Sequence, residues 1–480
     1  MPAAAAPPPP EDPRGLRGDA PLLDGYLEYL ASGARPFILP GHKGRTHLTG
    51  RVVSGDVQLY GGIDTLKLEH GRLAEAERRA AALWGADVCR FSVGGSTHAN
   101  QAFMLATTRP DAEVVVPRTL HRSLLSGLVL TGAVPVWVRP DVDAATGMPL
   151  AVAPEAVRSA LAAHPGATAV FLGDPSYVGT CGDVAAHAGI AHAGGIPLIV
   201  DAAWAAHFGF HPDLPPHALA QGADGLVTSA HKTLPAYSQA ALVLARTARI
   251  DAARLDAGVE ASATTSPAGS VLASIDASRA LLARDGKELT GALIALVAAA
   301  RDRLEEEPGL RVLRGAHVDP AKLVVLLAGT GADGNAVERD LVAAGFALEQ
   351  ADRDVLIPMV TLADDESTVG PFLDTLVASV RRHRGEARAV VPASSWLVDP
   401  DTAMTPREAY FADHAVTALR AAIGRVSAEL VAPYPPGVPV LAPGERITEH
   451  AVEILLAARE AGTRIAYAAD PSLDTLRTVA

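Results

Sequence analysis

The chain has 480 residues, 49% of them hydrophobic, and a formal net charge of −13, which allows two or three domains, or one large α/β domain with a smaller one attached. No block of Lys or Arg stands out, so we do not expect nucleic-acid binding, and no apolar stretch is long enough to span a membrane without an interrupting charge, glycine or proline. The two cysteines, Cys89 and Cys181, have no paired spacing, which argues against a Cys-x-x-Cys metal site and is typical of a cytoplasmic protein.

The N-terminal region contains a tail and an arm. Residues 1–20 begin with alanine and proline and lack the basic and apolar segments of a signal peptide, so we expect a disordered tail there. Residues 21–60 have a short helical pattern followed by the turn-rich loop 37–44, which predicts an arm and not a domain. A helix is expected over 72–85, where apolar residues recur on one face.

Strand and helix patterns alternate through the next part of the chain. Six short apolar runs are typical of strands, at 114–116, 134–138, 169–172, 197–200, 225–227 and 240–244. Because helical segments separate them, they predict a mostly parallel sheet covered on both faces, the core of a large domain over 61–300.

Two smaller units are expected after a long helix from 272 to about 307. Residues 301–385, with strands at 322–327 and 355–360, predict a small α+β domain. Residues 390–480 predict a separate C-terminal domain.

Two titratable residues follow apolar strands. Asp201 ends the run 197–200, and Lys232 follows 225–227 through a small polar turn. A lysine at the exit of a buried strand is partly desolvated, which lowers its pKa and frees its amine for Schiff-base chemistry. A carboxylate at a neighbouring exit can keep a pyridine nitrogen protonated, so the pair predicts a site for pyridoxal 5′-phosphate (PLP). His231, beside the lysine, is a candidate contact for the phosphate or a substrate carboxylate.

A glycine-rich turn at 93–100 lies between an apolar segment and a helix that we expect to begin near His98. Glycines let the backbone approach an anion, and hydroxyls and a helix N-terminus attract it, so the turn is a candidate phosphate site. An ordinary Ser or Thr N-cap would give the same pattern. His121, after another strand, is a candidate for stacking on a cofactor ring, although a lone histidine is more often a structural residue.

The order of these motifs resembles the ornithine/lysine/arginine decarboxylase family of PLP enzymes, from about Pro36 to the C-terminus. The matching segments are Pro40 to Lys43, Gly94 to Thr97, His121, Asp201 with Trp204, Ser229 to Lys232, Thr265 to Pro267, Ser427 to Glu429, Pro433 to Pro439 and Pro443 to Glu445. The resemblance implies the aspartate aminotransferase fold, an α/β architecture with a mostly parallel seven-stranded sheet in the large domain, a small α+β domain and a C-terminal α+β domain.

The resemblance also implies roles for the site residues. Lys232 would be the Schiff-base lysine, Asp201 the pyridinium partner and His121 the residue stacked on the ring. The other cofactor-binding residues would be Gly95, Ser96, Thr97, Trp204, Ser229 and His231. The candidates for the substrate site are Glu349, Asp64 and Trp204, with Glu69 as a further acidic residue. No metal ion is expected.

We therefore expect PLP-dependent decarboxylation of a basic L-amino acid, with Lys232 or His231 protonating Cα. Similarity to short arginine decarboxylases over 201–212 favours arginine to agmatine, with lysine to cadaverine and ornithine to putrescine as alternatives. Another PLP reaction, transamination or oxygen-dependent deamination, stays open, as does a non-catalytic PLP-binding regulator. The fold implies a homodimer, or a dimer-based oligomer, with active sites shared between subunits.

The chain departs from the family pattern at two places. It lacks the additional N-terminal domain of the large inducible members, so it resembles the shorter biosynthetic type, and no decamer is expected. The family's Ser-Pro-Ser-Tyr is here Ser266-Pro267-Ala268-Gly269, which puts glycine where the family has an aromatic residue.

Overall fold

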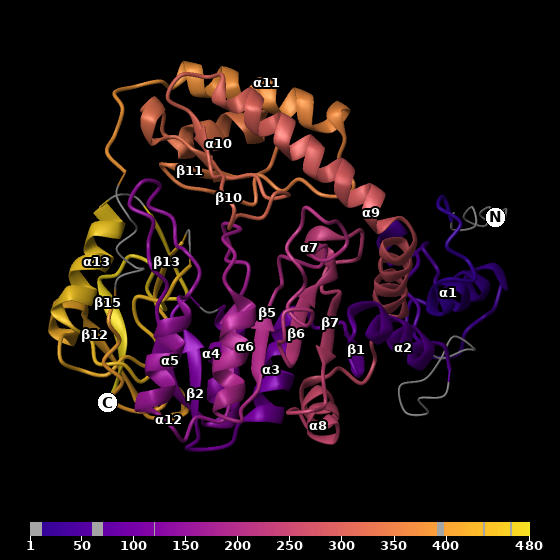
Figure 1. Cartoon of the computed structure of the whole chain (residues 1–480), viewed down its shortest axis with the longest axis horizontal. Coiled ribbons are helices and arrows are strands. Elements are labelled where there is room, and N and C mark those ends of the chain that lie inside the picture. The colour runs from indigo at the N-terminus through magenta and orange to yellow at the C-terminus, as the bar shows by residue number, and fades with distance from the viewer. Residues whose placement is uncertain (1–11, 60–70, 120, 391–397, 435–436, 461–462) are drawn as a thin grey trace.

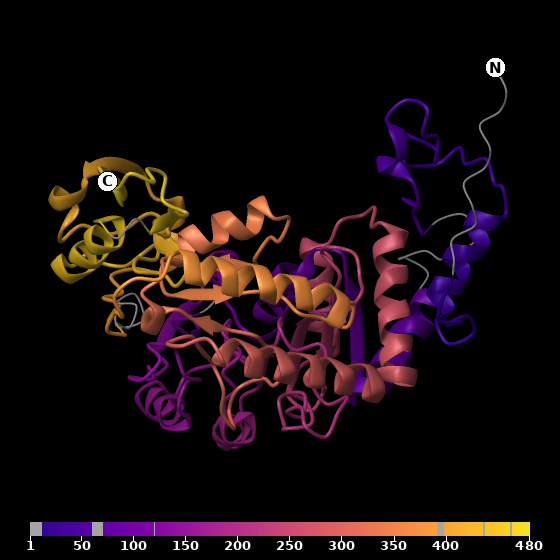
Figure 2. The ribbon, with the colours of Figure 1, turned by 90° about the horizontal axis from the view of Figure 1, so that it is seen from above.

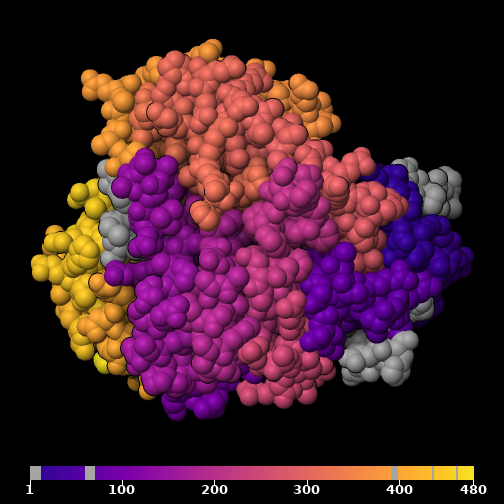
Figure 3. All heavy atoms as spheres, viewed as in Figure 1, coloured from indigo at the N-terminus to yellow at the C-terminus, as the bar shows by residue number. Residues whose placement is uncertain are grey.

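The computed structural model describes residues 12–59, 71–119, 121–390, 398–434, 437–460 and 463–480, so the candidate residues Asp64 and Glu69 lie outside the described residues. The chain forms three bodies (Figure 1). The small α+β body lies above one end of the strands of the large α/β body, and the C-terminal body lies beside the large body. In the space-filling view the small body, in orange, lies directly against the large one (Figure 3). Within the described ranges, no helix is long and apolar enough to cross a membrane.

A seven-stranded sheet forms the centre of the large body. Its strands are β1 (Val88–Ser92), β2 (Glu113–Pro117), β3 (Val134–Val138), β4 (Val170–Gly173), β5 (Leu198–Asp201), β6 (Gly225–Ser229) and β7 (Ala241–Ala245). They lie in the order β1-β7-β6-β5-β4-β2-β3, and only β7 runs antiparallel to its neighbours among these described strands. The predicted α/β fold with a mostly parallel sheet is confirmed. The strand absent from the predicted set, β1, carries the charged residue Arg90 in its middle and lies at the sheet edge, where a long charged side chain can reach solvent.

Helices cover both faces of the sheet. They are α2 (Arg72–Trp84), α3 (Gly95–Thr107), α4 (Arg122–Thr131), α5 (Pro154–Ala163), α6 (Val184–Ala193) and α8 (Ala252–Ser262). Along β2, Val114 and Val116 face the core under α3, α4 and α8, whereas Val115 faces the core under α2, α5 and α6. Burial on both faces explains why the strands are almost continuously apolar.

The small body follows the long helix α9 (Gly269–Glu305), which spans the predicted boundary at residue 300; the domain boundaries themselves stay predictions. Its described strands are β8 (Arg311–Val312), β9 (Val325–Leu326), β10 (Gln350–Ala351) and β11 (Val355–Ile357), which form an antiparallel sheet in the order β10-β11-β9-β8. The helices α10 (Gly334–Ala343) and α11 (Glu366–Arg382) complete it. The strand predicted over 322–327 is shorter, because Lys322 lies in a turn in which its N–H donates to Asp319 O at 3.1 Å.

The C-terminal body consists of short elements around its own core. They are α12 (Pro406–Phe411), β12 (His414–Ala418), β13 (Ala432–Tyr434), α13 (Glu449–Glu460), β14 (Arg464–Ala466) and β15 (Thr475–Val479). A buried ion pair between Arg118, after β2, and Glu445 fastens this body to the large one. Arg118 Nη2 donates a hydrogen bond to Glu445 Oε2 at 2.9 Å.

Residues 12–20, part of the predicted tail, pack against α9. Leu16 and Ala20 are buried there against Ala280 and Leu281. Helix α1 (Pro21–Ala31) continues from them, and the arm that follows extends away from the large body (Figure 2).

Gly269, where the resemblance implies an aromatic residue, contacts the backbone of the arm. Its N–H donates to Val57 O at 2.6 Å, and a Cβ on Gly269 would lie 2.9 Å from that oxygen. Any side chain at this position would therefore displace residues 57–58, so the glycine allows the arm to approach the start of α9.

Candidate active site

Asp201 and Lys232 come from adjacent strands of the central sheet. β5 ends at Asp201, and β6 ends at Ser229, directly before the short helix α7 (Ala230–Thr233) that carries Lys232. The two strands are parallel neighbours, with Asp201 paired with Val227. Their carboxyl ends therefore meet at one edge of the sheet, which is where open α/β sheets bind ligands.

The Lys232 side chain lies against the indole of Trp204, with Nζ 3.8 Å from the centre of the ring. Burial lowers the pKa of Lys232, and the negative charges of Asp201 and Glu349 offset part of that shift. Lys232 is thus a partly desolvated amine, as the strand-exit pattern predicts, and a larger fraction of it is neutral and nucleophilic than for a lysine in water.

Two hydrogen bonds orient the carboxylate of Asp201. Asn100 Nδ2 donates to Oδ2 at 2.7 Å, and the N–H of Ala203 donates to Oδ1 at 3.1 Å. The amide of Asn100 also donates to Ser123 Oγ at 3.0 Å, which ties the carboxylate to the start of α4. Asn100 is not among the predicted site residues, although it is fully buried on α3, one helical turn after Ser96.

His121 caps the N-terminus of α4. Its Nδ1 accepts a hydrogen bond from the Ser123 N–H at 3.3 Å and lies 2.9 Å from Ser123 Oγ. Burial lowers the pKa of His121; the charge of Asp201 raises it and that of Lys232 lowers it, so the ring lies within reach of both groups. His121 therefore has a structural role as an N-cap, which the sequence allowed. The same hydrogen bonds fix its ring beside Lys232 and Asp201. With Nδ1 accepting, the neutral ring carries its proton on Nε2.

The glycine-rich turn opens directly into α3, which begins at Gly95; the prediction that the helix starts near His98 is wrong. Gly95 has φ +68°, and this left-handed conformation lets the chain enter the helix at once. The N-cap of α3 is Gly94, which has no side chain with which to cap the first turn. Ser96 Oγ lies 2.7 Å from Ser229 Oγ, and both side chains are buried. Thr97 is exposed in the same first turn. The α3 N-terminus and the β6 exit therefore form one polar surface.

His231 is oriented by the chain that enters β7. Its Nδ1 lies 2.9 Å from the carbonyl oxygen of Ala240, so Nδ1 carries a proton and donates. The backbone N–H of His231 points to the same oxygen at 3.4 Å.

Glu349, in the small body, acts on groups of the other two bodies, Tyr177 of the large body and Tyr434 of the C-terminal body. Tyr177, after β4, donates a hydrogen bond from Oη to Glu349 Oε1 at 3.4 Å, and its ring packs edge-on against Trp204 at 5.1 Å. Burial raises the pKa of Tyr177, and the charge of Glu349 raises it further. Burial and Glu349 likewise raise the pKa of Tyr434 on β13, so this tyrosine faces the same carboxylate. Tyr177 and Tyr434 are further candidates; Tyr434 lies within the matching segment 433–439, whereas no local sequence pattern marks Tyr177.

The chain matches models of one protein family over most of its length. The model of the Orn/Lys/Arg decarboxylase major domain matches residues 20–325, and that of the Orn/Lys/Arg decarboxylase C-terminal domain matches residues 391–465. The chain belongs to the Orn/Lys/Arg decarboxylase family. The family consists of PLP-dependent carboxy-lyases, so the predicted family and enzyme class are confirmed, and membership implies PLP as the cofactor.

Individual family members align with the chain over nearly its whole length. The arginine decarboxylase of Halalkalibacterium halodurans is 30% identical over 478 residues, covering 96% of this chain and 97% of the relative. The arginine decarboxylase of Bacillus subtilis is 29% identical over 481 residues, covering 96% and 98%. The crystal structure of a lysine decarboxylase from Francisella novicida has a TM-score of 0.81 at 17% identity and covers 96% of this chain and 81% of that one. The structural likeness concerns the fold.

Proposed function

We propose that this protein decarboxylates a basic L-amino acid, with arginine to agmatine as the favoured reaction. The observation that carries the proposal is that two carboxylates, Asp201 at the end of β5 and Glu349 in the small body, both act on the charge of the buried Lys232. One carboxylate suits a pyridine nitrogen, and the other suits the cationic end of a basic side chain. The arginine decarboxylases aligned above support arginine as the substrate.

The described residues fit PLP. The α3 N-terminus, whose N-cap is the glycine Gly94, and the paired hydroxyls beside it would take the phosphate. The residues that would surround the phosphate are Gly95, Ser96, Thr97, Ser229 and His231. Asp201, oriented by Asn100, would hold the pyridine nitrogen, and Lys232 would hold the aldehyde carbon. When bound, PLP supplies an electron sink for the carbanion left when carbon dioxide departs.

Lys232 is the better of the two predicted proton donors to Cα. A neutral His231 carries its proton on Nδ1 and donates it to Ala240 O, so its Nε2 has no proton to give. Lys232 has a flexible amine whose pKa is lowered by burial, which brings its protonation equilibrium closer to neutral pH. Trp204 restrains that amine, and His121 would stack on the cofactor ring, held in orientation by Ser123.

Glu349, with Tyr177 and Tyr434 beside it, would receive the side chain of the substrate. A carboxylate accepts two parallel hydrogen bonds from a guanidinium, and aromatic rings stack on the flat face of the guanidinium. An ammonium would donate to the same carboxylate with looser geometry, which keeps lysine and ornithine as alternatives. Asp64, outside the described residues, stays a candidate from the sequence.

We also propose a homodimer and a cytoplasmic location. The arm carries exposed apolar side chains: Phe37 is 95% exposed, Leu48 79% and Val52 84%. Such a group of apolar residues on an extended segment fits contact with a second copy of the chain. Both cysteines are free, and Cys89 is buried with its thiol pKa raised, which fits a reducing compartment.

The experiment that tests the proposed function is product analysis. Purified protein loaded with PLP is incubated separately with arginine, lysine and ornithine, and the products are identified. Carbon dioxide with agmatine is expected from arginine, and Lys232→Ala should abolish it while leaving some cofactor bound. A keto acid or ammonia would instead support transamination or deamination, and cofactor absorbance without any product would support a regulator.

A further inference from the structure

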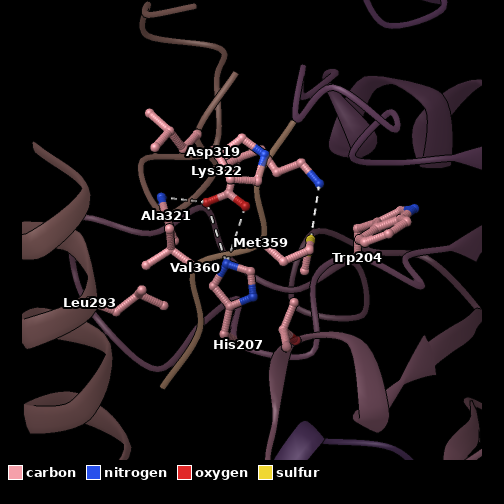
Figure 4. Close-up of a pocket in the computed structure, with 11 residues that line it drawn as sticks. Trp204, His207, Leu293, Asp319, Ala321, Lys322, Met359 and Val360 are labelled. Carbon is pink, nitrogen blue, oxygen red and sulfur yellow. Dashed lines mark hydrogen bonds and ion pairs between the residues drawn. The ribbon is translucent and has the colours of Figure 1, made fainter. Parts of the chain in front are cut away.

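A second lysine, Lys322, lies in the site and comes from the small body. Buried polar residues fix the turn that carries it. It lies at the end of the turn 319–322, and its side chain is 7% exposed. The buried guanidinium of Arg301 donates to the carbonyl oxygens of Asp319 at 3.0 Å and of Lys322 at 2.5 Å. The ring of His207, also buried, lies 3.2 Å from Asp319 Oδ2 (Figure 4). The turn is therefore fixed by buried polar groups on both sides.

The ammonium of Lys322 faces the same indole as Lys232. Lys322 Nζ lies 4.1 Å from the centre of the Trp204 ring, and Lys232 Nζ lies 3.8 Å from it. The two nitrogens are thus no farther apart than the sum of these two distances. Tyr177, whose hydroxyl donates to Glu349, has its ring centre 5.3 Å from Lys322 Nζ.

No carboxylate neutralises Lys322 among the residues that the structure describes. Its Nζ has a hydrogen-bond contact at 3.7 Å with the sulfur of Met359, a weak acceptor, and it takes part in no ion pair there (Figure 4). Burial lowers the pKa of Lys322 to about 8, and the negative charges of Asp319 and Glu349 offset part of that shift. A buried ammonium without an oxygen partner is costly, and a bound anion would compensate it.

Gly179 makes room for this lysine. It follows Tyr177 in the loop after β4 and has φ +87°, and a Cβ there would lie 2.9 Å from Lys322 Cγ. The carbonyl oxygen of Gly179 accepts a hydrogen bond from the N–H of Asp319 at 2.8 Å. The absence of a side chain at Gly179 therefore leaves the space that the Lys322 stem occupies on its way to Trp204.

We propose that Lys322 binds the α-carboxylate of the amino-acid substrate. The inference rests on the proposed function, because it assigns one end of the substrate of that reaction. A basic L-amino acid carries an anion at Cα and a cation at the far end of its side chain. Lys322 and Glu349 offer the two complementary charges around Lys232, whose position marks where Cα would lie. The role of Lys322 is binding: its ion pair exists with the substrate and is absent with the amine product.

Matched pairs of ligands isolate this contact: arginine with agmatine, lysine with cadaverine, and ornithine with putrescine. The members of a pair differ only by the carboxylate. Binding is measured by the absorbance of PLP and by calorimetry in a Lys232→Ala parent, which carries out no turnover. Adding Lys322→Met should weaken binding of the amino acids about tenfold, the value of one charge-assisted hydrogen bond, and leave binding of the amines within about twofold.

Two further variants separate a carboxylate contact from a structural role. Lys322→Arg keeps the charge and should recover part of the amino-acid affinity. Gly179→Ala keeps the lysine but crowds its stem, so it should reproduce the selective loss even if Lys322→Met fails to fold. Lys287→Met, on the exposed face of α9, is the matched control and should change nothing.

The outcomes distinguish the two proposals. A loss confined to the amino acids supports Lys322 as the carboxylate site. Equal losses for amino acids and amines, or no loss for either, would overturn it and leave the proposed function intact. A parent that binds no member of the three pairs would overturn the proposed function, and the assignment of Lys322 with it.

Discussion

Asn100 and Asp201 are joined by a hydrogen bond of 2.7 Å between an amide on α3 and the carboxylate at the end of β5. The helix that offers its N-terminus at Ser96 therefore also fixes the acid on the neighbouring strand. Both ends of a bound cofactor would depend on one helix, since the phosphate would lie at its N-terminus and the ring nitrogen would lie one turn along it.

Replacing Asn100 with alanine should weaken PLP binding about tenfold, because the carboxylate of Asp201 loses its main orienting hydrogen bond. Asn100→Asp should have a larger effect, since it places a second negative charge beside Asp201. Cofactor titration followed by absorbance measures both. Asn335→Ala on α10 is the control, and equal PLP affinity in the Asn100 variants and this control would contradict the prediction.

Glu349→Gln should raise the KM for arginine about tenfold, because a charged hydrogen bond to the guanidinium becomes a neutral one. Its kcat should change less, since Glu349 does not touch the reacting carbon. Steady-state kinetics with arginine, lysine and ornithine provide the comparison, with Glu366→Gln at the exposed start of α11 as the control. A fall in kcat at unchanged KM would argue against Glu349 as the side-chain acid.

The affinity for the amino-acid substrate should fall as pH rises through about 8, the lowered pKa of Lys322. The sign follows from the charge: the ammonium is present below this pH and is lost above it, so the ion pair with the α-carboxylate weakens. The charged groups that act on Lys322 are Asp319, Glu349 and Lys232. Arginine-binding curves between pH 7 and 9.5 should diverge between the Lys232→Ala parent and its Lys322→Met variant, with the fall in the parent shifted to higher pH because the charge of Lys232 is gone. Parallel curves would contradict the prediction.

Breaking the ion pair between Arg118 and Glu445 should destabilise the attachment of the C-terminal body by about 3 to 5 kcal/mol, the cost of leaving one buried charge without its partner. Both side chains are almost fully buried, with 1% and 3% exposed. Glu445→Gln followed by denaturant unfolding and limited proteolysis tests this. Arg158→Ala, which breaks the exposed pair with Glu155, should cost less than about 1 kcal/mol.

Replacing exposed apolar residues of the arm with serine should weaken self-association of the protein. Phe37→Ser combined with Val52→Ser removes two large exposed apolar side chains and should shift the protein from dimer towards monomer in light scattering after size exclusion. Val416→Ser, which is 73% exposed on the C-terminal body, serves as the control. An unchanged dimer in the arm variant would show that these side chains do not hold it together.

The elements that carry Asp201 and Lys232 could be predicted from their own residues. Both follow short apolar runs, and a run buried on two faces has a local signature that does not depend on its neighbours. The alternation of apolar runs with helical segments predicted the sheet, and the resemblance to the family rested on the strand exits and the glycine-rich turn together with the proline-rich segments near both ends of the chain. The start of α3 was misplaced because a positive φ at Gly95 lets the helix begin inside a turn.

Which side chains meet around Lys232 depends on the tertiary structure and could not be predicted from the sequence. Asn100 and Asp201 are 101 residues apart, and Tyr177 and Glu349 are 172 residues apart, so no local periodicity relates them. Lys322 reads in the sequence as the first residue of a strand. It becomes part of the site because Arg301 holds its turn and Gly179 leaves room for its stem. Such contacts depend on how separate bodies pack, and packing is a property of the whole chain.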